Sequence, residues 1–162
     1  MKEKKLNILF VCTGNVCRSP MAEGILKNTI SNKLKDKFNV QSAGISAIDG
    51  MRASTFAVEV SKNNGINISS HRSRQITEKM MSENDFIFVM AEEHLEYLKN
   101  NYTKYIDKVY ALKQFNNPDN TDINIEDPIG GDLDSYEKIF YEIKHEIERI
   151  FPELIKISGE NE

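Results

Sequence analysis

Cysteine is scarce in this sequence, which contains only Cys12 and Cys17, five positions apart. A small secreted domain held together by disulfides would contain more of them. Two thiols also make a poor zinc site, because no cluster of histidines or further cysteines elsewhere completes one. We therefore expect no secreted disulfide scaffold, no metal ion and no other cofactor.

An excess of positive charge and a long apolar run are also missing. The chain has 21 Lys and Arg against 25 Asp and Glu, a formal net charge of −4, whereas broad binding to nucleic acid or to a membrane surface needs a positive field. No run approaches the ~20 apolar residues of a membrane span. The apolar stretch after the basic start MKEKK is too short for a signal peptide. These absences predict a cytoplasmic protein that binds neither nucleic acid nor membranes.

The length of 162 residues suits one domain, and no linker, repeat or low-complexity segment divides the chain. We expect a single domain over residues 1–162 with its core at about residues 6–151. The segment 152–162, which begins at Pro152, is expected to be a frayed tail.

Apolar runs of strand length alternate with helical patterns along the chain. Residues 6–11 are apolar except for Asn7, as expected of a parallel strand that is buried on both faces. Further strands are expected at 38–43, 85–90 and 108–112, and helices at 19–30, 53–63, 77–81, 92–100 and 133–151. This alternation predicts an α/β fold, a doubly wound four-stranded parallel sheet with helices on both faces.

The segment CTGNVCR, residues 12–18, joins the first expected strand to the first expected helix. Ligands of open α/β sheets bind at the carboxyl ends of the strands, and N–H groups at a helix N-terminus favour anions. A thiolate is favoured at Cys12 in that field, and the planar guanidinium of Arg18 suits two phosphate oxygens. The segment therefore indicates phosphoryl transfer through a cysteine.

The longer stretch VCTGNVCRSPMAE closely resembles the active-site signature of the low-molecular-weight protein tyrosine phosphatases. The likeness extends to residues 42–44 (SAG), to residues 71–75 (HRSRQ) and to the pair Asp127-Pro128. This resemblance implies an enzyme that hydrolyses phosphotyrosine-type phosphomonoesters on proteins through a phosphocysteine intermediate. It implies a phosphorylated protein as substrate, inorganic phosphate as product and inhibitor, and a monomer or weak dimer.

The resemblance also assigns roles to matching positions. Cys12 resembles the nucleophile, Arg18 the phosphate-binding arginine, and Asp127 the general acid that later acts as base toward water. The expected phosphate cradle consists of Thr13, Gly14, Asn15, Val16, Cys17 and Arg18. The expected supporting residues are Ser19, which hydrogen-bonds the thiolate, and Asn15, Ser42 and His71, which hold the loop.

Some of these roles do not follow from the residues alone. Spacing does not separate Asp127 from Asp119, Asp122, Asp132 or Asp134, and the resemblance alone selects it. Cys17 is either a small core residue or a partner that forms a reversible disulfide with Cys12. His94 and His145 lie in charged helical segments, where we expect them to be solvated.

The phosphorylated side chain stays open between two classes. Tyrosine-specific members have aromatic residues around the pocket, where this chain has Ile48 and Ile129. Thr13 and the sequence Asp127-Pro-x-Gly-Gly resemble the bacterial protein-arginine phosphatase branch, and a hydroxyl and a carboxylate could accept guanidinium N–H groups. We lead with phosphotyrosine, keep phosphoarginine as the alternative, and expect Thr13, Ile48 and Ile129 to set specificity.

Three other functions are weighed against a phosphatase. An arsenate reductase of this fold relays a disulfide through downstream cysteines, and none follows Cys17. A phosphocarrier must keep its phosphocysteine, so Arg18 and a hydrolytic acid are unexpected there. A binding module without catalysis would not need Cys12, Arg18 and Asp127 together.

Overall fold

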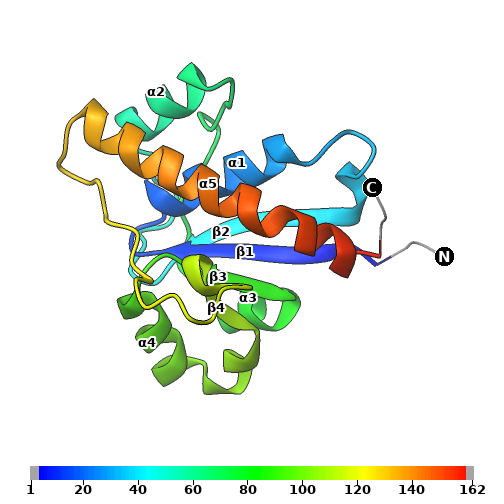
Figure 1. The fold of residues 1–162 in the computed structure, drawn as a ribbon. Coiled ribbons are helices and arrows are strands. Elements are labelled where there is room, and N and C mark those ends of the chain that lie inside the picture. Colours follow the sequence, from blue (N-terminus) through cyan, green and yellow to red (C-terminus); the bar gives the residue numbers. More distant parts are fainter. Residues whose placement is uncertain (1–3, 160–162) are drawn as a thin grey trace.

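The computed structural model describes residues 4–159, which form four strands and five α-helices (Figure 1). The strands are all parallel, in the order β2-β1-β3-β4. Their bounds are β1 (Leu6–Cys12), β2 (Phe38–Gly44), β3 (Phe86–Val89) and β4 (Val109–Ala111). The helices are α1 (Arg18–Thr29), α2 (Thr55–Asn63), α3 (Glu78–Glu83), α4 (Glu92–Asn101) and α5 (Leu133–Ile157). The expected α/β fold is confirmed, while residues 1–3 and 160–162 of the expected domain lie outside the described residues.

Strand β1 lies inside the sheet and is buried on both faces. Ile8 and Phe10 pack into the core beneath α1 and α5, and Leu9 and Val11 pack into the core that includes α3 and α4. All four are fully buried, as the apolar run predicts. Figure 1 shows α1, α2 and α5 on one side of the sheet and α3 and α4 on the other.

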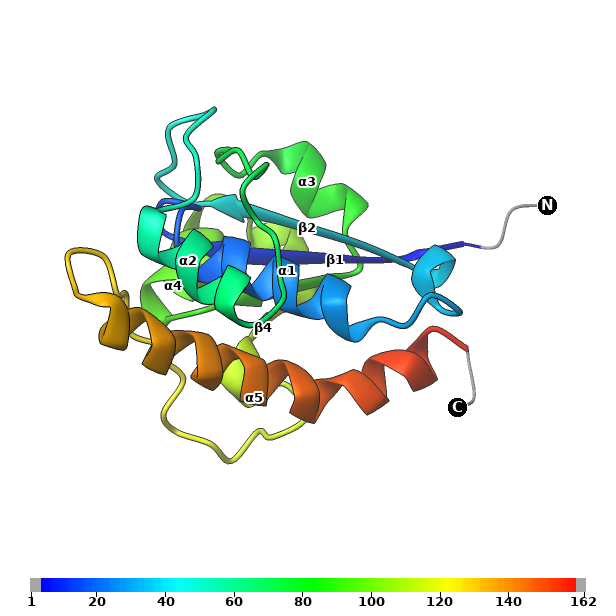
Figure 2. The ribbon, with the colours of Figure 1, turned by 90° about the horizontal axis from the view of Figure 1, so that it is seen from above.

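The carboxyl ends of the strands gather the loops that matter for function. Strands β1 and β2 pair along their whole length, which sets Cys12 opposite Gly44. The loops after β1 and β2 and the segment before α5 meet at this end of the sheet, away from the described ends of the chain (Figures 1 and 2). In open parallel sheets this is the edge where ligands bind.

The expected helix end at residue 151 is wrong, because α5 continues through Pro152 to Ile157. A proline inside a helix removes one backbone hydrogen bond at a cost of about 3 kcal/mol. The apolar stripe of α5 nevertheless runs on past it, and both Leu154 and Ile155 are buried. Packing of these side chains outweighs the local preference, so residues 152–157 belong to the core-facing helix and not to a frayed tail.

Replacing Leu154 with alanine should therefore lower the free energy of unfolding by about 2–5 kcal/mol, the usual effect of emptying a buried leucine site. Urea unfolding at neutral pH measures this change. The matched control is Ile157→Ala in the same turn, whose side chain is 41% exposed and should change stability by less than about 0.5 kcal/mol. Equal effects of the two substitutions would contradict the placement of the helix end.

Candidate active site

The loop between β1 and α1 is held by its carbonyl groups and leaves its N–H groups free. Three of its carbonyls accept from backbone N–H groups of other segments: Cys12 O from Ile45 N (3.0 Å), Thr13 O from Ser46 N (2.9 Å) and Val16 O from Ser54 N (2.8 Å). The N–H groups of residues 13–17 donate in none of the backbone hydrogen bonds found among residues 4–159. Unpaired N–H groups that precede a helix N-terminus form a place for an anion.

Gly44 allows the neighbouring strand to approach this loop. A Cβ atom built on Gly44 would lie 2.5 Å from Thr13 O and 3.0 Å from Asn15 N. Any side chain at this position would therefore push the loop away from β2. Among residues 42–44, which resemble the family sequence, glycine is therefore required at position 44 for steric reasons.

The Cys12 sulfur is buried at the start of the loop, 2.9 Å from Ser19 Oγ. The Ser19 oxygen accepts a hydrogen bond from Asn15 Nδ2 at 2.8 Å. The Ser19 hydroxyl has two acceptors within reach of its proton, the Cys12 sulfur at 2.9 Å and the Ala43 carbonyl at 3.4 Å. The sulfur is therefore within hydrogen-bond distance of the Ser19 hydroxyl, which can donate to it.

Asn15 adopts a left-handed backbone, with φ of 57°, in the middle of the loop. Its amide donates to Ser19 Oγ and to Ser42 Oγ (3.0 Å) and accepts from the N–H of Arg74 at 3.0 Å. Its carbonyl accepts the Nε2–H of His71 at 2.7 Å. The structure therefore brings together Asn15, Ser19, Ser42 and His71, the four residues expected to support the loop.

Glu23 extends this network and was not among the expected site residues. Ser42 Oγ donates to Glu23 Oε1 at 2.7 Å, and Lys27 Nζ lies 2.7 Å from Glu23 Oε2. Ser42 and Glu23 come from β2 and α1, so the sequence separation hides their contact. The only signal is the position of Glu23 one turn after Ser19, on the same face of the helix.

Arg18 is the first residue of α1 and its guanidinium is almost fully buried, with 3% of the side chain exposed. Nη1 donates to Ile125 O at 2.8 Å, and Nη2 donates to Thr13 Oγ1 at 3.2 Å. Nε is buried and has no hydrogen-bond partner within the described part of the chain. A buried donor without a partner is costly in a folded protein and marks a place for a ligand acceptor.

Asp127 lies in the long segment between β4 and α5, beside Arg18. Its Oδ2 is 3.4 Å from Arg18 Nη2, and its Oδ1 accepts the N–H of Ile129 at 3.1 Å. The carboxylate is 38% exposed, so it faces both the buried guanidinium and solvent. The geometry thus distinguishes Asp127 from Asp122, which pairs with Lys113, and from Asp132, which caps α5.

The expectation that His94 is solvated is wrong. The imidazole is fully buried, with Nε2 2.9 Å from Thr13 Oγ1 and Nδ1 3.3 Å from the Met90 N–H. Burial, and then the positive charge of Arg18, lower the pKa of His94 to about 3. The nearby Glu93 carboxylate does not offset this, because its side chain is largely in water. The ring is therefore neutral at physiological pH.

Cys17 is buried, and its sulfur has different hydrogen-bond partners from the sulfur of Cys12. Its Sγ contacts Ser54 Oγ at 3.4 Å and Tyr136 OH at 3.3 Å. Burial raises the pKa of the Cys17 thiol, against these two hydrogen bonds, which lower it. Burial likewise raises the pKa of Tyr136 to about 12. A disulfide between Cys17 and Cys12 is absent in this structure, where both described cysteines are free, and the redox role stays a prediction.

Two exposed isoleucines lie on the loops around this site. Ile48 follows β2 and is 73% exposed, and Ile129 follows the Asp127-Pro128 pair and is 62% exposed. Ile129 also lines a hollow of about 320 Å³ beside Asp127. Of the three expected specificity residues, these two face solvent, whereas the Thr13 hydroxyl contacts protein groups.

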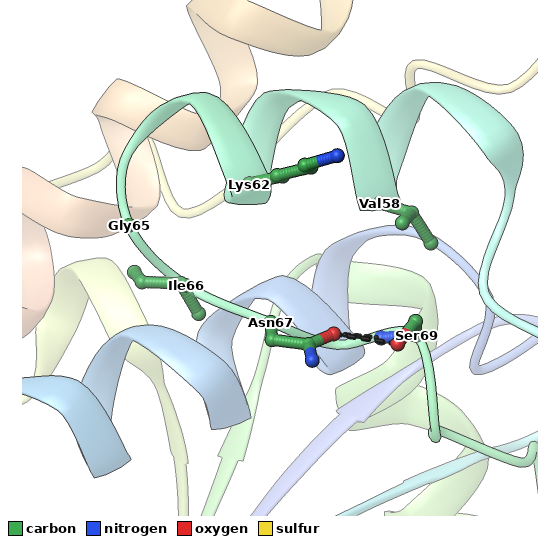
Figure 3. Close-up of a pocket in the computed structure, with 6 residues that line it drawn as sticks. All are labelled: Val58, Lys62, Gly65, Ile66, Asn67 and Ser69. Carbon is green, nitrogen blue, oxygen red and sulfur yellow. Dashed lines mark hydrogen bonds between the residues drawn. The ribbon is translucent and has the colours of Figure 1, made fainter.

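A larger hollow of about 470 Å³ lies apart from the loop, at the end of α2 (Figure 3). It is lined by Val58, Lys62, Gly65, Ile66, Asn67 and Ser69. Its Ser69 hydroxyl donates to Asn67 Oδ1 at 2.6 Å. Among the described residues that line it, none has a buried polar atom without a partner. The unpaired backbone N–H groups and the unpaired guanidinium Nε are at the loop, and we expect the chemistry there.

Residues 4–159 contain no group of three or more His, Cys, Asp or Glu side chains that could hold a metal ion. No helix formed by these residues is both long and apolar enough to cross a bilayer.

Comparison with known proteins gives matches over nearly the whole chain. The family model described as low molecular weight phosphotyrosine protein phosphatase matches residues 7–159. A protein-arginine-phosphatase of Bacillus subtilis (strain 168) is 34% identical over 151 residues, which are 93% of this chain and 95% of that protein. A solved arginine phosphatase from Geobacillus stearothermophilus is 33% identical with a TM-score of 0.87, covering 97% of both chains. A low molecular weight protein tyrosine phosphatase from T. tengcongensis is 38% identical with a TM-score of 0.83, covering 92% of this chain and 99% of that one.

The neutral, buried His94 predicts a loss of stability in acid. Its pKa falls from the ordinary histidine value of 6.5 to about 3 in the fold, so the unfolded chain binds the extra proton as the pH drops below about 6.5. The stability linked to His94 is complete above that pH and is lost progressively toward pH 3. Between pH 7 and pH 5 the free energy of unfolding should fall by about 2 kcal/mol more in the wild type than in His94→Gln.

Urea unfolding at the two pH values measures this difference. His145→Gln serves as the matched control, since His145 is exposed on α5, and it should follow the wild type. Parallel pH profiles of the wild type and His94→Gln would show that His94 is not buried in its neutral form.

Proposed function

Because the chain belongs to the low molecular weight phosphotyrosine protein phosphatase family, we propose that it hydrolyses phosphotyrosine side chains through a phosphocysteine on Cys12. Membership confirms the resemblance drawn from the loop sequence and makes the protein a phosphatase of phosphoproteins.

The observation that carries the proposal is the set of unused donors around Cys12. The N–H groups of residues 13–17 lack backbone acceptors among the described residues, and the buried Arg18 Nε has no partner there either. A phosphate dianion would supply acceptor oxygens to these donors, with its phosphorus next to the Cys12 sulfur. Phosphoryl transfer depends mainly on such positioning and charge stabilisation. Inorganic phosphate should occupy the same cradle and inhibit.

In the first step, the Cys12 thiolate attacks phosphorus and the bond from phosphorus to the tyrosine oxygen breaks. The leaving oxygen takes the electron pair and receives a proton from Asp127. The position of Asp127 beside Arg18 supports this role.

In the second step, water attacks the phosphocysteine and Asp127 takes up the proton of that water. The sulfur–phosphorus bond breaks, and the sulfur leaves as a thiolate. The hydroxyl of Ser19, 2.9 Å from Cys12 Sγ, donates a hydrogen bond to this thiolate and makes it a better leaving group. Asn15 supports the step by fixing the Ser19 oxygen through Nδ2.

Two features favour phosphotyrosine over phosphoarginine. The Thr13 hydroxyl contacts His94, Arg18 and Glu93, so it is not free for a substrate guanidinium. Exposed apolar side chains at Ile48 and Ile129 offer contact to an aryl ring, whereas a charged guanidinium loses hydration against them.

Phosphoarginine is the second candidate. Arginine phosphatases of Bacillus subtilis and Geobacillus stearothermophilus are among the similar proteins, at identities close to that of the tyrosine phosphatase. The partly exposed Asp127 carboxylate could also accept a guanidinium N–H.

An assay on paired peptides with the same flanking sequence tests the nucleophile and the substrate class together. We expect a higher kcat/KM for phosphotyrosine than for phosphoarginine, and loss of both activities in Cys12→Ser. Cys17→Ser is the matched control, because the Cys17 sulfur contacts Ser54 and Tyr136, and it should keep turnover. Hydrolysis by Cys12→Ser would exclude the proposed nucleophile, and a reversed substrate order would establish the second candidate.

Asp127→Asn should slow the first step most for substrates with poor leaving groups. General acid catalysis typically contributes about 10²–10⁴-fold, and an acidic phenol needs little of it. Single-turnover release of substituted phenols should therefore depend more steeply on phenol acidity in Asp127→Asn than in the wild type. Asp119→Asn, at an exposed position of the same segment, should leave the slope unchanged. An unchanged slope in Asp127→Asn would remove Asp127 from the role of acid.

A further inference from the structure

We propose that His94 is a positioning residue, which acts through Thr13 to fix the Arg18 guanidinium in the orientation that binds phosphate. The proposal rests on the function proposed above, because it concerns the arginine of the same site. His94 belongs to α4, and it is neither part of the loop nor one of the residues that were expected to support the loop.

The hydrogen bonds define which way the protons point. The N–H of Met90 donates to His94 Nδ1 at 3.3 Å, so the proton of the neutral ring is on Nε2. From there it is donated to Thr13 Oγ1 at 2.9 Å. The Thr13 hydroxyl directs its own proton toward Glu93 Oε1, at 3.4 Å.

Thr13 Oγ1 is thereby oriented as an acceptor for Arg18 Nη2, at 3.2 Å. The Ile125 carbonyl holds Nη1 at 2.8 Å. These two acceptors fix the plane of the guanidinium and leave its buried Nε without a protein partner among the described residues. Without the proton from His94, the Thr13 hydroxyl would be free to rotate. The guanidinium would then keep the Ile125 carbonyl and the partly exposed Asp127 carboxylate, but it would lose its oriented hydroxyl acceptor.

A neutral ring is required for this arrangement. A charged imidazolium would place a second cation near Arg18 in a buried site. The complete burial of His94 and the charge of Arg18 both lower its pKa, to about 3. The ring therefore keeps Nδ1 as an acceptor and Nε2 as a donor over the physiological pH range.

The two amide side chains separate the two hydrogen bonds of the ring. His94→Gln can place a donor near the Nε2 position and keep the bond to Thr13, whereas His94→Asn can only mimic Nδ1 and keep the bond to Met90. We expect His94→Asn to lower kcat/KM and to weaken inhibition by inorganic phosphate, each by about 10- to 100-fold, as for loss of a hydrogen bond that orients a charged group. His94→Gln should stay within about threefold of the wild type.

Double substitutions show whether the effect acts through Arg18. In an Arg18→Lys background, His94→Asn should cause little further loss, because the guanidinium that it positions is already absent. Thr13→Val should match His94→Asn, and Thr13→Ser, which keeps the oxygen, should be more active than Thr13→Val and should respond to His94→Asn as the wild type does. This second pair of variants tests the proposal even if His94→Asn does not fold. His145→Asn, at an exposed position of α5, is the control for an unrelated histidine.

Two results would overturn the proposal. His94 only supports the fold of α4 if His94→Asn and His94→Gln lose activity equally. The same conclusion follows if His94→Asn lowers kcat/KM by the same factor in the Arg18→Lys background as in the wild type. If the wild type neither hydrolyses phosphopeptides nor binds inorganic phosphate, the function proposed for the site is wrong as well. Activity in the wild type with no effect of His94→Asn or Thr13→Val refutes the positioning role alone.

Discussion

The left-handed backbone of Asn15 is the constraint on which the loop between β1 and α1 depends. For a side chain other than glycine this conformation costs about 1–2 kcal/mol, although asparagine tolerates it better than most. Three hydrogen bonds of the Asn15 amide, to Ser19, Ser42 and Arg74, offset the strain, at about 1 kcal/mol each. The turn allows the loop N–H groups to stay unpaired around Cys12 while the loop carbonyls bond outward. Without the hydrogen bonds of the Asn15 side chain, the backbone of the loop would relax from this strained turn, and its N–H groups would no longer be held in place.

The elements around the loop act on it from three directions. Strand β2 approaches it closely at Gly44 and supplies Ser42. Helix α1 supplies Ser19 and Arg18 from its first turn, and the start of α4 supplies His94. Each contributes a buried polar group whose hydrogen bonds are directional, so the site is held by polar contacts inside an otherwise apolar fold. A rigid set of donors needs little reorganisation when charge shifts during phosphoryl transfer.

The sequence predicts the parts of this architecture that depend on local patterns. The apolar run in β1 requires burial on both faces and so predicts a parallel sheet. The loop that follows it carries a specific motif, which predicts the family. The contact of Glu23 with Ser42, and that of His94 with Thr13, cross between elements and have no local signature. A histidine among the glutamates of α4 indicates a solvated face, and only the packing of that helix shows the opposite. The end of α5 does not follow from the sequence, because a local proline rule is weaker than the burial of Leu154.

We propose above that the phosphoryl group passes through the Cys12 sulfur at the end of β1. The most direct test of this proposal is to mix the protein with a phosphotyrosine peptide, denature it within milliseconds and locate the phosphoryl group by fragmentation of the resulting peptides. Fragmentation is needed because no Lys or Arg separates Cys12 from Cys17. We expect one phosphoryl group, on Cys12, which forms and decays at rates compatible with turnover. A phosphoryl group on Cys17 or on another side chain, or turnover without any adduct, would contradict the claim.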